Sequence, residues 1–175
     1  MPSVQPPAVP LPPDDPQRAL TLADPDDPGL THVGVAGGTY TFLVTGTQTA
    51  GKYALIDMLI PAGGGPPPHR HDFEEMFHVL EGEFDVTVRD RTRRAAVGQT
   101  INIPALAPHR FRNTSDSQGR LLCLVSPSGL EEFFLAVGDL LPNRTAPAPQ
   151  LSEAQLKERL ARSASLNAQY RIENL

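Results

Sequence analysis

The feature that most constrains the fold is a series of short apolar stretches between Gly37 and Val125, each ended by turn-forming residues. Phe84, Val86 and Val88 alternate with polar residues, which is the period of a strand with one buried face and one solvated face. A chain of 175 residues with 19 prolines and 14 glycines favours turns and short strands over long helices. Short strands at this regular spacing predict an all-β sandwich or barrel.

The other predicted strands are rich in β-branched and aromatic residues, and they cover residues 40–44, 52–60, 77–80, 101–103, 110–113 and 121–125. The last of these is apolar at every position. We therefore expect both of its faces to be buried, with another element covering its outer side. Its Cys123 is expected to be a core residue, and a lone cysteine excludes an internal disulfide framework.

The two ends of the chain differ from the middle. Residues 1–29 contain nine prolines, which predicts an extended arm laid against the domain or against a second subunit. Residues 130–137 could form one or two helical turns, and a capping box at Ser152 and Gln155 predicts a helix over residues 153–166. We expect an arm over residues 1–29, a β-barrel domain over 30–145 and a C-terminal helical segment over 146–175.

The charge pattern argues against nucleic acid as a partner. The net charge is −5, and the densest basic stretch is Arg89, Arg91, Arg93 and Arg94, interrupted by Asp90. We interpret this cluster as a solvated hairpin end, with anion binding as the alternative. No apolar stretch approaches the roughly 20 residues that span a bilayer. The N-terminal residues contain no Lys or Arg before an apolar region, so we expect no secretory signal. A cytoplasmic protein without a membrane partner is expected.

The residues that carry chemistry are three histidines and one glutamate. Residues two apart on a strand point to the same face, so His69, His71 and Glu75 share one side, whereas Glu74 points away. His109 follows a second turn. Three neutral imidazoles and one carboxylate suit one divalent first-row metal, namely Fe, Mn, Ni, Co, Cu or Zn. Coordination positions stay open if the metal takes five or six ligands, as catalysis requires.

Two spaced motifs contain these residues. The first reads Gly63, five residues, His69-x-His71, three residues, Glu75, six residues, Gly82. The second reads Gly98, five residues, Pro104-x-Leu106, two residues, His109, three residues, Asn113. Both resemble the two motifs of the cupin superfamily. The one departure is Leu106, which stands where the family usually has a glycine, and it concerns the shape of the loop rather than the ligand set.

The resemblance covers roughly residues 37–138. It implies an all-β cupin double-stranded β-helix, or jelly-roll barrel, with the Pro-rich N-terminal arm and the short C-terminal helix added. It also implies that His69, His71, Glu75 and His109 bind the metal inside the barrel. The sequence from Gly65 to Gly82 is similar to that of bacterial single-domain cupins described as quercetin 2,3-dioxygenase-like.

That similarity implies a dioxygenase that acts on a flavonol-like or another enolisable aromatic small molecule, with Glu75 as the general base. The alternatives are an oxygen-independent metal-cupin enzyme, such as an isomerase or lyase, and a cupin that binds or senses a small molecule without catalysis. The side chains expected to form the substrate pocket are Phe111, Phe73, Met76, Phe77 and Phe84. His78 is expected to face outward, and a homodimer is expected because cupins are commonly dimers.

Overall fold

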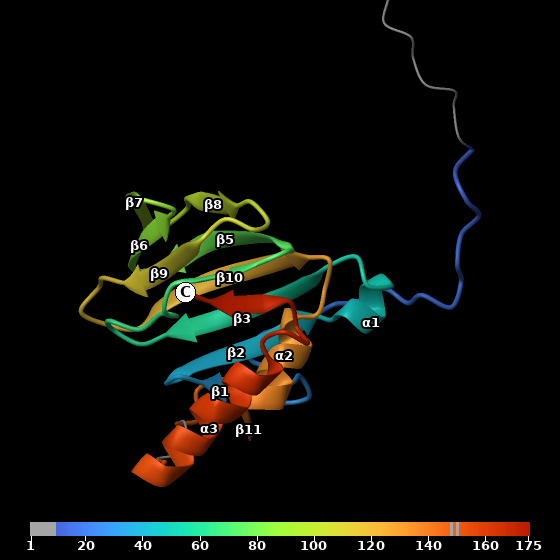
Figure 1. Cartoon of the computed structure of the whole chain (residues 1–175). Helices are drawn as coiled ribbons and strands as arrows, with labels where there is room; N and C mark the ends of the chain where they lie inside the picture. Colours follow the sequence, from blue (N-terminus) through green and yellow to red (C-terminus); the bar gives the residue numbers. More distant parts are fainter. Residues whose placement is uncertain (1–9, 148, 150) are drawn as a thin grey trace, which may run out of the picture.

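The computed structural model describes residues 10–147, 149 and 151–175, and these form two antiparallel sheets and three helices (Figure 1). The first sheet contains, in spatial order, β11 (Asp139–Leu141), β1 (His32–Val35), β2 (Gly38–Val44), β3 (Ala54–Ile60), β10 (Gly119–Ser126), β5 (Glu74–Glu81) and β8 (Thr100–Ile103). The second sheet contains β12 (Ile172–Asn174), β4 (His69–His71), β9 (His109–Asn113), β6 (Glu83–Val88) and β7 (Arg91–Ala96). The helices are α1 (Gly46–Thr49), α2 (Leu130–Val137) and α3 (Glu153–Leu166). The predicted all-β class with a short C-terminal helix is confirmed.

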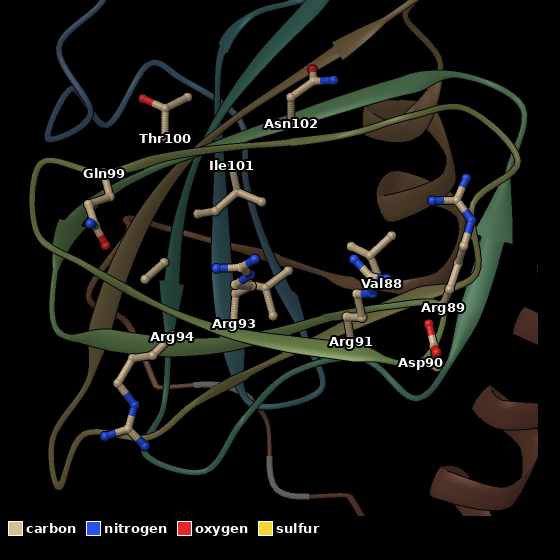
Figure 2. A pocket seen from close by; sticks show the side chains of 12 residues that line it. Val88, Arg89, Asp90, Arg91, Arg93, Arg94, Gln99, Thr100, Ile101 and Asn102 are labelled. Atoms are coloured by element: carbon tan, nitrogen blue, oxygen red, sulfur yellow. The ribbon is translucent and has the colours of Figure 1, made fainter.

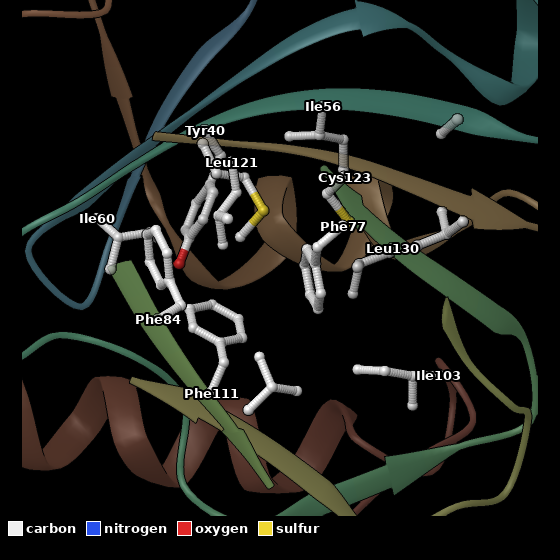
Figure 3. Packing of buried hydrophobic residues seen from close by; sticks show 14 of the residues in the cluster. Tyr40, Ile56, Ile60, Phe77, Phe84, Ile103, Phe111, Leu121, Cys123 and Leu130 are labelled. Carbon is white, nitrogen blue, oxygen red and sulfur yellow. The ribbon is translucent and has the colours of Figure 1, made fainter. Parts of the chain in front are cut away.

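The core lies between the two sheets and consists of the inward side chains of their strands. In β6, Phe84 and Val86 are buried while their neighbours are partly exposed, as the alternation predicts. The ring centroid of Phe111 in β9 lies 5.1 Å from that of Phe77 in β5 and 6.1 Å from that of Phe84, and both contacts are edge-on (Figure 3). Edge-to-face pairs add about 0.5–1.5 kcal/mol beyond the burial of their area. These rings tie one sheet to the other.

The expectation that both faces of β10 are buried is wrong. Leu121, Cys123 and Val125 are almost completely buried, whereas Leu122 and Leu124 are only partly buried. β10 pairs with β3 and β5 in the middle of its sheet, so alternate side chains face the core and the outer surface. Helix α3, which could have covered the outer surface, packs against α2 instead.

The two longer helices have the predicted bounds. At the start of α3, the Ser152 hydroxyl accepts a hydrogen bond from the Gln155 backbone N–H, and the Gln155 side chain accepts one from the Ser152 backbone N–H. Helix α2 is held to the first sheet by Tyr40 of β2, whose ring stacks on Phe134 with centroids 4.6 Å apart. Within the part of the chain that the structure describes, no helix is both long and apolar enough to cross a membrane.

The described part of the N-terminal arm extends away from the two sheets (Figure 1). Residues 10–20 are all exposed, and Leu11 and Leu20 are 94% and 95% exposed. A hydrogen bond of 3.1 Å from the Arg18 guanidinium to the carbonyl oxygen of Gln48 links the arm to α1. Residues 1–9 of the predicted arm lie outside the described residues. The proposed boundaries between arm, domain and C-terminal segment stay a prediction.

Replacing Arg120 with alanine should destabilise the first sheet. The side chain of Asp57 is 1% exposed, and Arg120 Nε donates a hydrogen bond of 2.8 Å to its Oδ2 atom, while a second guanidinium nitrogen lies 2.8 Å from the same oxygen. Without Arg120, the buried carboxylate keeps only Arg144, whose guanidinium lies 3.6 Å from Oδ1. Breaking a buried ion pair costs about 3–5 kcal/mol, so urea unfolding should show a loss near the lower end of that range. The control Arg94→Ala breaks an exposed pair with Asp85 and should leave the urea midpoint close to that of the wild-type chain. Equal losses would contradict this account of Asp57.

Candidate metal centre

The four predicted ligands come together inside the barrel from three strands. His69 and His71 lie on β4, Glu75 on β5 and His109 on β9. One ligand atom from each residue lies within 4.8 Å of all the others. The β4–β9 ladder places His69 directly opposite His109, and their ring centroids are 4.2 Å apart. Glu75 is buried in the cluster, whereas Glu74 is exposed. This agrees with the prediction that Glu75 shares one side of the strand with the histidines and that Glu74 points away.

Each histidine is oriented by a backbone carbonyl two residues away. The Nδ1 atoms of His69, His71 and His109 lie 2.9, 2.9 and 2.8 Å from the carbonyl oxygens of Pro67, Phe73 and Ala107. A carbonyl oxygen only accepts, so each Nδ1 must carry the hydrogen. In the neutral imidazoles, the Nε2 lone pairs then face the cluster.

This arrangement fits a bound cation. The Nε2 atoms of His71 and His109 lie 3.3 and 3.1 Å from the same oxygen, Oε2 of Glu75. Lone pairs that face each other at this distance need a positive charge between them, either a proton or a metal ion. Three imidazole nitrogens and one carboxylate are a donor set for a divalent transition metal. The residues present therefore fit the metal that the sequence predicts.

The surroundings favour the metal-binding protonation states of two ligands. Burial and the neighbouring His109 lower the pKa of His69 to about 4. Burial raises the pKa of Glu75, but hydrogen bonds and charges from His109 and His71 outweigh it and lower the pKa to about 2. Burial lowers the pKa of His109, yet the hydrogen bond and the charge of Glu75 leave it raised. At neutral pH, His69 is an imidazole and Glu75 a carboxylate.

Cys123 is a neighbour of the cluster whose role the sequence did not indicate. Its thiol donates to Oε1 of Glu75 across 3.6 Å. Burial and the charge of Glu75 hold the pKa of this thiol well above its usual value, so it stays protonated. The donor fixes the second carboxylate oxygen while Oε2 faces the histidines. An apolar run such as that of β10 predicts burial but does not show which polar atom a cysteine will meet.

Two motif residues shape the loops around the ligands. The Asn113 side-chain amide donates to the carbonyl oxygens of Ile60, Pro61 and Ser117 at 3.0, 3.2 and 2.9 Å, which fixes the end of β9. Leu106 has a φ of 67°, so it adopts the left-handed conformation of the glycine that the family usually has there. Its N–H donates to the carbonyl oxygen of the ligand His71 at 2.7 Å. The departure from the motif leaves the loop shape intact.

The last residues of the chain form a strand against the ligand strand. In the β12–β4 ladder, Ile172 pairs with His71 and Asn174 with His69. The Leu175 N–H donates to the Pro68 carbonyl oxygen at 3.0 Å. β12 is thus the edge of the second sheet and holds β4 from its outer side. A strand of three residues is too short to show a periodicity that could have predicted it.

Deleting residues 172–175 should weaken metal binding because β4 would become an unpaired edge. Loss of groups that support metal ligands typically lowers affinity 10–100-fold, and we expect an effect of about this size in a competition titration with a chelator. The control Glu173→Ala removes only the exposed ion pair with Arg70 and keeps the backbone ladder. Its affinity should stay within a factor of about five of the full chain. A truncated chain that binds metal as tightly as the full chain would contradict this role of β12.

A cavity of about 680 Å³ opens over the cluster. Its floor includes His69, His71 and Glu75, and Phe111 forms part of its wall. Burial raises the pKa of the Tyr40 hydroxyl in this wall, so the hydroxyl stays protonated. The far side is lined by the C-terminal segment, through Leu151, Leu156, Leu160 and Asn167. The capping box at Ser152 predicted this helix, but not that its Leu156 and Leu160 would line the cavity.

Of the five residues predicted for the substrate pocket, Phe111 lines this cavity and four do not. Phe73 stacks on the ring of His71 with centroids 3.7 Å apart, so it supports a ligand. Phe77 and Phe84 are buried in the core behind Phe111. Met76 pairs with Leu124 and Asn102 on the outer face of the first sheet, opposite to Glu75. Small barrels fill their interior with side chains, which leaves few aromatic rings free for a ligand.

The other two histidines lie outside the cluster. His78 is on the outer face of β5, where its Nδ1 atom lies 2.9 Å from the Thr100 hydroxyl, in agreement with the predicted outward direction. His32 is buried in β1 between the Thr41 hydroxyl and the Asp27 carbonyl oxygen, at 2.9 and 3.1 Å. The sequence assigned it no role, and its contacts tie the end of the arm to the sheet.

A second hollow of about 910 Å³ lies between β7 and β8 and shares no residue with the metal cavity (Figure 2). Val86, Val88 and Ile101 give it an apolar floor. The predicted arginine cluster forms its rim. The four arginines are exposed, as expected of a hairpin end.

Comparison with known proteins identifies the family. A model of the cupin domain matches residues 56–125. Protein SchB of Streptomyces halstedii is 30% identical over 118 residues, which are 66% of this chain and 86% of that protein. An uncharacterized protein of Methanocaldococcus jannaschii is 30% identical over 77 residues, which are 43% of this chain and 62% of that protein.

More distant relatives carry different functional names. The quercetin 2,3-dioxygenase of Bacillus subtilis is 26% identical over 127 residues, which are 72% of this chain and 37% of that enzyme. The transcriptional regulator PuuR of Escherichia coli is 26% identical over 116 residues, which are 66% of this chain and 60% of the regulator. The chain thus spans less than two thirds of the length of most of these relatives.

The fold is shared with solved cupin structures. A predicted oxalate decarboxylase from Thermotoga maritima superposes with a TM-score of 0.55 at 15% identity, over 61% of this chain and 98% of that one. An RmlC-like cupin from Shewanella frigidimarina gives 0.53 at 18% identity, over 61% of this chain and 91% of that one. With its two motifs, its paired sheets and a His/Glu cluster compatible with a divalent metal, the chain belongs to the cupin superfamily.

Proposed function

We propose that this cupin is a metal-dependent dioxygenase that acts on a flavonol-like or another enolisable aromatic molecule. The observation that carries the proposal is the position of the His/Glu cluster at the floor of a cavity with largely apolar walls. Such a cavity suits a flat, weakly polar ligand with one polar end. The relative named quercetin 2,3-dioxygenase supports the same class of substrate.

The chain's own residues would do three things for this reaction. Phe111 would hold the aromatic ring against the wall of the cavity, and the protonated Tyr40 hydroxyl could donate to a substrate oxygen. Glu75 would accept the proton of the substrate hydroxyl, with Cys123 holding the other carboxylate oxygen in place. A divalent metal held by Glu75 and the three histidines would supply Lewis acidity and, if redox-active, electron exchange with dioxygen.

The test is dioxygen uptake with quercetin by protein that carries one equivalent of Fe, Mn, Ni, Co or Cu. We expect uptake that depends on the metal and on quercetin, followed with an oxygen electrode. The His69→Ala, His109→Ala double variant provides the background. Absence of uptake with every metal would overturn the proposal for this substrate class.

Two further measurements separate the alternatives. Turnover of a substrate under strict anaerobiosis would favour oxygen-independent isomerase or lyase chemistry at the same site. Tight binding of a small molecule without any product would favour a binding or sensing role, for which the regulator among the relatives is a precedent.

A further inference from the structure

The arginine-lined hollow between β7 and β8 combines features that a solvated hairpin end does not need. In the β6–β7 ladder, Arg93 lies opposite Val86 and Arg91 opposite Val88. Residues directly opposite in a ladder share one face, so these two arginines lie on the inner face of the sheet with the valines. Arg94 lies opposite Asp85 and so belongs to the outer face. Figure 2 shows Arg91 and Arg93 at the mouth of the hollow, whereas Arg94 borders the hollow and directs its guanidinium to Asp85.

The two faces of β7 also differ in their ion pairs. On the outer face, Arg94 pairs with Asp85 at 3.1 Å and with Glu83 at 3.7 Å. Among the described residues, no carboxylate lies within ion-pair distance of Arg91 or Arg93. The remaining positions, 1–9, 148 and 150, contain no Asp or Glu in the sequence. Asp90 also lines the hollow, but it lies beyond ion-pair distance of both arginines. Arg91 and Arg93 therefore lie above an apolar floor without a paired carboxylate among the described residues.

The N-terminal arm has the complementary chemistry. Its exposed residues include Leu11, which is 94% exposed, followed by the adjacent acids Asp14 and Asp15. The prolines around them favour an extended polyproline conformation, so little conformational entropy would be lost on docking. Arg18 holds the arm at α1, and Figure 1 shows α1 on the opposite side of the molecule from β7 and β8. The arm is therefore placed to reach a neighbouring molecule rather than its own hollow.

We propose that the arm of a second copy of this chain docks into the hollow, with Leu11 on the apolar floor and Asp14 and Asp15 on Arg91 and Arg93. Two copies related by a two-fold axis exchange arms reciprocally, which closes the assembly as a dimer. The acidic and basic patches attract each other at low salt, and the leucine excludes water from the ion pairs. The docked arm would then be the contact that holds the two copies of the predicted homodimer together.

The test is the oligomeric state of the full-length chain by sedimentation equilibrium at low and high salt. We expect the wild-type chain to form a dimer that weakens as salt rises. The variant Arg91→Gln, Arg93→Gln should raise the dimer dissociation constant roughly tenfold or more, and so should Asp14→Asn, Asp15→Asn. The matched control Arg94→Gln changes an arginine of the same strand that faces the other way, and it should leave the constant within about threefold.

A charge exchange gives the sharpest form of the test. A chain with Arg91→Glu and Arg93→Glu should be monomeric, and adding Asp14→Arg and Asp15→Arg to it should restore the dimer. A wild-type monomer up to about 1 mM would overturn the proposal, and so would a dimer that none of these variants affects. Binding of inorganic phosphate at Arg91 and Arg93 without dimerisation would assign the hollow to a small anion instead. Increased aggregation of the glutamine variant would show that the two arginines only protect the edge of β7.

Discussion

Replacing His69 and His109 together with alanine is expected to reduce the metal content of the chain from about one equivalent to nearly none. The two residues lie opposite each other in the β4–β9 ladder and supply two of the three imidazoles. The remaining His71 and Glu75 come from strands of different sheets and offer only two donor atoms, too few for a stable transition-metal site. Mass spectrometry of protein purified without a histidine tag measures the metal directly.

The matched control is His78→Ala. His78 is on β5, as Glu75 is, but it faces the outer surface, where it meets Thr100. This variant should keep the metal content of the wild-type chain. A double variant that retains its metal, or a His78 variant that loses it, would place the metal somewhere other than in the barrel.

Replacing Gly65 with alanine is expected to disturb both stability and metal binding. Gly65 has a φ of 149°, and a Cβ atom at this position would lie 2.0 Å from the carbonyl oxygen of Phe111. The contact lies between the loop that leads into β4 and the strand β9, and β4 and β9 carry three of the four predicted ligands. Relief of the clash must move one of them, so we expect a loss of at least about 2 kcal/mol in the free energy of unfolding, together with reduced metal occupancy.

Gly98→Ala separates backbone strain from this clash. Gly98 also has a positive φ, of 82°, but a Cβ atom there would have no atom within 4 Å. Its cost should be only about 1 kcal/mol, with full metal occupancy. Urea unfolding and metal analysis of both variants provide the comparison. Equal behaviour of the two variants would mean that the close approach of Gly65 to β9 does not position the ligands.

The parts of the fold that sequence predicts well are those with a strict local period. The alternation of Phe84, Val86 and Val88 gave both the strand and its buried face, and the capping box at Ser152 gave the first turn of α3. The alternation along a strand likewise placed Glu75, rather than Glu74, on the side of His69 and His71, and the structure brings these three residues together with His109. In each case, the residues that allow the prediction lie within a few positions of the strand, helix end or side chain that is predicted.

The parts that sequence missed depend on pairing between distant segments. β7 contains three arginines and lies at a sheet edge, where no apolar period is required, so it was interpreted only as a hairpin end. β12 is a strand because β4 offers it an edge. Likewise, Met76 could be taken for a pocket residue until the β5–β10 register placed it on the outer face.

One metal ion is expected to lie among His69, His71, Glu75 and His109. Anomalous diffraction from crystals of the metal-loaded chain, measured on both sides of the absorption edge of the metal, tests it most directly. We predict a single strong peak within bonding distance of the three Nε2 atoms and of the Glu75 carboxylate, at roughly 2.0–2.2 Å. A peak elsewhere in the chain, or no peak from protein that contains stoichiometric metal, would contradict the account.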